Sequence, residues 1–85
     1  MKLADIGYGN YVAAEKVLAV CAPDAAPIKR LVTEAKEKGR VIDVTCGKKT
    51  KSVILTENGI VLLCALTPEK TAERLQLDEG SEKND

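Results

Sequence analysis

The stretch SVILTENGIVLLCAL, residues 52–66, decides the fold of this chain. Two apolar runs, Ser52–Thr56 and Ile60–Leu66, flank the tripeptide Glu57-Asn58-Gly59. Asn-Gly between two such runs is a strong signal for a tight β-hairpin. The sequence therefore predicts two paired strands here, and the other elements must be arranged around them.

Four further strands are predicted upstream of this hairpin. A glycine-containing turn, GYGN, follows the first of them, and Gly7 and Gly9 there permit backbone conformations that other residues rarely adopt. The predicted strands cover residues 2–6, 11–13, 16–22 and 41–44.

Two helices complete the prediction. Asp24 is expected to cap the first helix, with Pro27 in its first turn and Gly39 just after its last residue. Its apolar positions follow the i, i+3, i+4, i+7 spacing of an amphipathic helix, at Ile28, Leu31, Val32 and Ala35. Thr67 is expected to cap a second, short helix that ends near Leu75 and must dock on a sheet or on a neighbouring subunit. The fold class is thus α+β, a small, largely antiparallel sheet with one amphipathic helix and a short C-terminal helix.

Charge divides the chain into a mildly basic domain, residues 1–76, and an acidic tail, residues 77–85. The domain holds 12 Lys or Arg and nine Asp or Glu, whereas the tail holds one Lys and four acids. The tail LDEGSEKND has no apolar periodicity and is predicted to be disordered, either as a plain solvated terminus or as a competitor for the basic surface. A single domain of 85 residues without Phe or Trp can build only a modest core, which favours a homo-oligomer.

The segment DVTCGKKTK, residues 43–51, is the strongest functional signal. It places Lys48, Lys49 and Lys51 in a loop between two predicted strands, where a rigid scaffold can present them to a polyanion. Solvated surface lysines are the alternative reading. Since Tyr8 and Tyr11 are the only aromatic residues, stacking platforms for single strands are scarce, and duplex DNA is the better polyanion.

Catalysis and metal binding find little support. The chain has no histidine, and its three cysteines form no CxxC pair. Cys21 and Cys64 are expected to be small apolar strand residues, while Cys46 is either a small residue at a strand end or a redox-sensitive thiol near lysines. Neither GYGNYV nor GKKT completes a nucleotide-binding motif. We expect no enzyme activity, no metal, no cofactor and no membrane segment, in a cytoplasmic protein.

The ordered motifs resemble a known family. The run IGYGNYVAAEKVLAV, followed by residues 23–75 beginning PDAAPIKR and including DVTCGKKT, is similar to the RemA family of small bacterial regulators of extracellular matrix genes. The resemblance covers about residues 1–75. It implies a homo-oligomeric ring, a fold related to half of a LytTR-type DNA-binding domain, and activation of matrix and biofilm genes.

The resemblance also implies site residues. The family's basic pair after the loop glycine falls on Lys48 and Lys49, and its basic residue before the second strand falls on Lys16. Lysines stand where the family commonly has arginines, so phosphate contact is better supported than base-specific readout. We expect a DNA-binding transcriptional regulator that uses these three residues and Lys51. The alternative is a ring-forming structural module whose basic rim binds an acidic protein or a small phosphorylated ligand.

Overall fold

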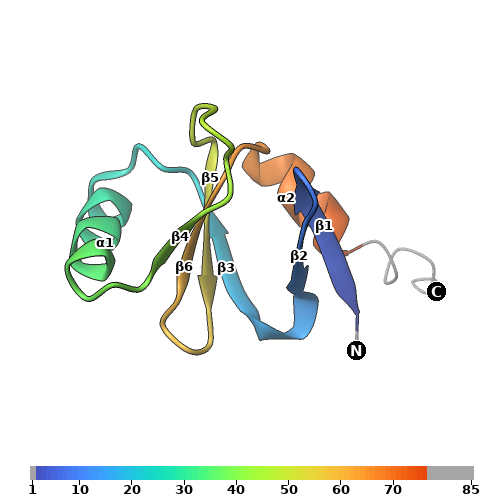
Figure 1. The fold of residues 1–85 in the computed structure, drawn as a ribbon, viewed down its shortest axis with the longest axis horizontal. Helices are drawn as coiled ribbons and strands as arrows, with labels where there is room; N and C mark the ends of the chain where they lie inside the picture. Colours follow the sequence, from blue (N-terminus) through green and yellow to red (C-terminus); the bar gives the residue numbers. More distant parts are fainter. Residues whose placement is uncertain (1, 77–85) are drawn as a thin grey trace.

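The computed structural model describes residues 2–76, and the predicted acidic tail lies outside them. The fold is α+β, with six strands in two sheets and two α-helices (Figure 1). The elements are β1 (Leu3–Gly7), β2 (Asn10–Ala13), a 3₁₀ turn (Ala14–Lys16), β3 (Val17–Cys21), α1 (Ala26–Glu37), β4 (Val41–Asp43), β5 (Ser52–Thr56), β6 (Val61–Cys64) and α2 (Pro68–Leu75).

The predicted hairpin forms the centre of the larger sheet, whose strand order is β3-β5-β6-β4. In its loop, the Gly59 N–H donates to the Thr56 carbonyl at 3.2 Å, and Gly59 alone has a positive φ, of +80°. The loop is therefore a turn followed by a left-handed glycine rather than a two-residue turn built on Asn58.

The sheets differ from the single, largely antiparallel sheet that the sequence predicts. β1 and β2 form a separate two-stranded sheet, and β4 pairs with β6 in parallel. β4 and β6 are neighbours in the sheet, but β5 lies between them in the sequence. Since β5 runs antiparallel to β6, the chain reverses twice between β4 and β6, and these two strands run in the same direction. Apolar periodicity identifies strands, but it does not say which neighbour an edge strand takes.

The four-stranded sheet is covered on both faces. Alternate residues of β5 and β6 point to opposite sides, as the period of two requires. One side packs α1 through a cluster that contains Ala35, Val53 and Val61. The other side packs Ile54 and Leu62 against the β1–β2 sheet and the segment before α2 through Ile6, Val12 and Leu66. Figure 1 shows the resulting layers, with α1 on one side and β1, β2 and α2 on the other.

The ends of α1 confirm one predicted signal and contradict another. Gly39 lies just after the helix with φ +70°, and the Arg40 N–H donates back to the Ala35 carbonyl at 2.9 Å, which closes the C-terminus. The prediction that Asp24 caps the helix is wrong, because the N-cap is Ala25 and no side chain caps it. With Pro27 in the first turn, one fewer N–H needs a partner there.

The short C-terminal helix α2 docks on its own protomer. The Thr67 hydroxyl caps it by accepting from the Lys70 N–H at 3.2 Å, as predicted. Arg74 donates to the Asp5 carbonyl at 2.9 Å, and the fully buried Thr71 lies 3.2 Å from the Ser52 hydroxyl. These contacts hold the helix across β1 and the start of β5.

Candidate nucleic-acid interface

The loop between β4 and β5, residues 44–51, is built on a tight turn. The Lys48 N–H donates to the Thr45 carbonyl at 3.0 Å, and the two residues between them have φ angles of +54° at Cys46 and +80° at Gly47. An i to i+3 hydrogen bond around two left-handed residues is the pattern of a type I′ turn. The turn fixes the direction in which the chain enters Lys48.

Asp43 anchors the start of the loop. Its carboxylate accepts from the Thr45 hydroxyl at 2.7 Å and from the Thr45 N–H at 2.9 Å, and Thr45 is itself buried. The pKa of the Asp43 carboxyl lies below its ordinary value. The largest cause is the hydrogen bond from the Thr45 hydroxyl, followed by the one from the Thr45 N–H, and the nearby Lys36 charge lowers the pKa further. The ionised side chain thus stabilises the turn.

The end of the loop is fixed to the sheet. The Lys51 N–H donates to the Cys64 carbonyl at 2.8 Å, next to the fully buried Ser52. The loop is therefore tied at both ends, and its three lysines project from a defined backbone.

All three loop lysines, Lys48, Lys49 and Lys51, are exposed, and none takes part in an ion pair within residues 2–76. An anion that binds here displaces water and counterions without first breaking an internal salt bridge. The structure thus brings together three of the four predicted contact residues.

The fourth predicted contact residue, Lys16, lies at the other end of the sheet. Its carbonyl accepts from the Glu57 N–H at 2.9 Å, and its ammonium is 3.7 Å from the Glu57 carboxylate. Since β5 separates this hairpin end from Lys51, the two sets of lysines are about 15–20 Å apart along the strand at roughly 3.3 Å per residue. Figure 1 shows the loop before β5 and the β5–β6 hairpin at opposite ends. One protomer does not place Lys16 beside the loop.

The cysteines are all free thiols. Cys64 is buried, Cys21 is half-buried on β3, and Cys46 is exposed in the turn. No three His, Cys, Asp or Glu side chains gather into a metal-binding group in the part of the chain that the structure describes. Nor does either described helix have the length and apolar character needed to span a membrane.

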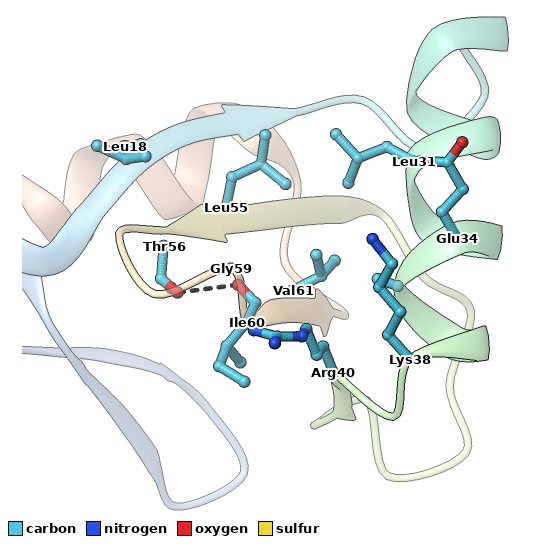
Figure 2. Close-up of a pocket in the computed structure, with 11 residues that line it drawn as sticks. Leu18, Leu31, Glu34, Lys38, Arg40, Leu55, Thr56, Gly59, Ile60 and Val61 are labelled. Atoms are coloured by element: carbon cyan, nitrogen blue, oxygen red, sulfur yellow. Dashed lines mark hydrogen bonds between the residues drawn. The ribbon is translucent and has the colours of Figure 1, made fainter.

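A largely apolar groove of about 400 Å³ opens beside α1, on the side of the edge strand β3 (Figure 2). Leu18, Leu31 and Leu55 line it, and Leu18 is 69% exposed. Glu34, Lys38 and Arg40 supply its charged lining. An exposed leucine on an open sheet edge is unusual, because edges with apolar side chains invite pairing with another chain. Sequence reasoning missed this groove, since Leu18 reads as one more residue of an apolar strand.

Comparison with known proteins places the chain in a family. The model of the RemA-like family, described as extracellular matrix regulatory protein A-like, matches residues 3–75. The chain belongs to this family of regulatory proteins, as its motifs predicted.

Relatives of similar length support the same assignment. A protein of Synechococcus elongatus is 47% identical over 78 residues, which cover 92% of this chain and 90% of the relative. A second, of Lachnoclostridium phytofermentans, is 46% identical over 84 residues, covering 99% and 92% of the two chains. A third, of Desulforamulus reducens, is 44% identical over 82 residues, covering 96% and 91%. Their names describe them provisionally as regulatory proteins.

Proposed function

We propose that this chain is a cytoplasmic DNA-binding transcriptional regulator, an activator of matrix and biofilm genes that acts as a homo-oligomeric ring. The observation that carries the proposal is the β4–β5 loop, where a type I′ turn and two anchored ends present Lys48, Lys49 and Lys51 without internal ion pairs. Membership of the RemA-like family supports the regulatory role.

Self-assembly is part of the proposal because one protomer offers few contacts. Three loop lysines give a modest attraction to phosphates, whereas linked copies make each later contact intramolecular and raise the avidity. The open edge of β3 and the apolar groove around Leu18 offer a surface that a second copy could cover. We further propose that residues 1–76 form this DNA-binding and oligomerisation unit and that its fold is related to half of a LytTR domain.

The test replaces both Lys48 and Lys49 with alanine. Both side chains are exposed, so the variant should keep its oligomer and its melting temperature. Its affinity for a duplex of about 30 base pairs should fall by orders of magnitude, and the salt dependence should become shallower by about 1.8 in log-log slope for each subunit that loses two phosphate contacts. Fluorescence anisotropy at several salt concentrations measures both quantities, and sedimentation measures the oligomer.

The matched control is Arg30→Ala with Lys70→Ala, which removes the same charge from exposed positions outside the loop. It should bind DNA like the unmodified protein. Equal affinity and equal salt slope for the loop variant and the unmodified protein would show that the loop is not the DNA-binding surface. A protein that binds no duplex, but does bind an acidic protein or a phosphorylated small molecule, would favour the interaction-module alternative.

A further inference from the structure

A second groove, on the opposite flank of α1 from the apolar one, is lined by basic side chains. Its volume is about 360 Å³. Lys29, Thr33 and Lys36 form one wall, Thr50 contributes from the β4–β5 loop, and Val32 and Val53 lie among the remaining lining residues. The groove therefore adjoins the loop that carries Lys49 and Lys51.

The helical spacing explains why the two lysines share this groove. Lys29, Thr33 and Lys36 stand at i, i+4 and i+7, and so they form one stripe along α1. The stripe borders the apolar face that packs Ala35 and Val32 on the sheet. Lys29 and Lys36 are separated by seven residues, or about 10 Å of helix at 1.5 Å per residue.

The charges of the two flanks differ. Lys29 and Lys36 are exposed and form no ion pair within the described residues, and no acidic side chain lines their groove. Asp43 lies near Lys36, and its carboxylate is already hydrogen-bonded to Thr45. The apolar groove on the other flank, by contrast, has an acidic side chain, Glu34, in its lining together with Lys38.

The hydroxyls of the groove complete its chemistry. The Thr33 hydroxyl already donates to the Lys29 carbonyl at 3.0 Å, which leaves its oxygen as an acceptor only. Donors for an anion must therefore come from the two ammonium groups and from Thr50. Apolar carbon atoms of Val32 and Val53 between these polar groups suit a ligand that alternates charged and uncharged parts.

We propose that this groove is a second DNA contact, in which Lys29 and Lys36 hold phosphates of the strand that the β4–β5 loop also touches. The proposal rests on the function proposed above and extends the contact surface at the loop end of each subunit from three lysines to five. A sugar-phosphate backbone fits the groove better than an isolated phosphate, because its charges repeat along a line and deoxyribose separates them. Contacts of this kind position the duplex and do not read its sequence.

The experiment compares three variants of the whole chain with the unmodified protein. The groove variant is Lys29→Gln with Lys36→Gln, and the loop variant is Lys48→Ala with Lys49→Ala. The matched control is Arg30→Gln with Lys70→Gln, which makes the same charge change at exposed helix positions that do not line the groove. Sedimentation and thermal unfolding establish that all four proteins keep the same assembly, and duplex affinity is measured from about 0.05 to 0.3 M salt.

The groove variant should lose about tenfold or more in duplex affinity near 0.15 M salt, with a shallower salt slope, while the control should not. Because phosphates carry no sequence information, the loss should be equal for two duplexes of unrelated sequence. If the loop variant loses binding and the groove variant does not, the groove is not a DNA contact although the proposed function stands. If neither variant changes binding, both the groove and the loop assignments are wrong.

Discussion

The backbone of the β4–β5 turn makes the identity of residue 46 a direct test of the loop geometry. Cys46 has φ +54° and an exposed side chain. A residue with a β-carbon in the left-handed region costs roughly 1–2 kcal/mol, and asparagine or glycine lowers that cost. Because the Cys46 side chain is exposed, its replacement changes the backbone preference with little change in packing.

Two substitutions should therefore move stability in opposite directions. Cys46→Asn should raise the free energy of unfolding by up to about 1 kcal/mol, since asparagine is favoured at this place in a type I′ turn. Cys46→Val should lower it by about 1–2 kcal/mol, because a β-branched residue at positive φ is strained. Each kcal/mol corresponds to roughly 4–8 °C in melting temperature for a domain of this size.

Urea unfolding at one fixed protein concentration measures these changes, because the stability of an oligomer depends on concentration. Cys46→Ser is the control for loss of the thiol, and it should leave duplex affinity within a few fold and independent of reductant. An asparagine variant no more stable than the valine variant would refute the turn assignment. A large effect of reductant on DNA binding by the unmodified protein would show that Cys46 is a redox switch.

Two further predictions concern polar groups that flank the β4–β5 loop. Thr71→Val leaves the Ser52 hydroxyl buried without its partner and should cost about 1–3 kcal/mol, whereas Ser52→Ala combined with Thr71→Val should cost less than the sum of the single changes in urea unfolding. Since the pKa of Asp43 is lowered on folding, its stabilising contribution is complete above the unfolded value of about 3.9 and is lost as pH falls through the folded pKa. Asp43→Asn should accordingly flatten the fall in stability as pH drops below about 4, and an unchanged pH profile would contradict this.

The elements that sequence alone predicts are those with local signals. Asn58-Gly59 between apolar runs predicts the central hairpin, and Thr67 before a proline predicts the cap of α2; both are confirmed. Asp24 fails as a cap because α1 starts one residue later than an Asp24 cap would place it. The partner of β4 and the division into two sheets depend on contacts distant in sequence, which no local signal carries.

The turn that presents the loop lysines had a readable signal that sequence analysis did not use. An aspartate accepts from the N–H two residues later in both Asp5–Gly7 and Asp43–Thr45. In each case a left-handed pair ending in glycine follows at once, Tyr8-Gly9 in the first and Cys46-Gly47 in the second. The shared spacing, an aspartate four residues before a turn glycine, therefore accompanies a left-handed pair twice, although the first turn also has a left-handed Gly7 where the second has Thr45. The exposure of Leu18 has no comparable signal, because it depends on how far α1 extends over the sheet.

The positions of Lys16 and the loop restrict how subunits can be arranged if both touch one duplex. The two lie at opposite ends of β5, so a single protomer offers them to DNA about 15–20 Å apart. A head-to-tail arrangement brings the hairpin end of one subunit toward the loop end of the next, and repetition of such a contact by rotation closes a ring. A two-fold dimer joined through either end would instead place like ends together and keep Lys16 away from Lys48. A ring built from such head-to-tail contacts is a closed oligomer larger than a dimer, so sedimentation as a stable dimer would exclude the ring.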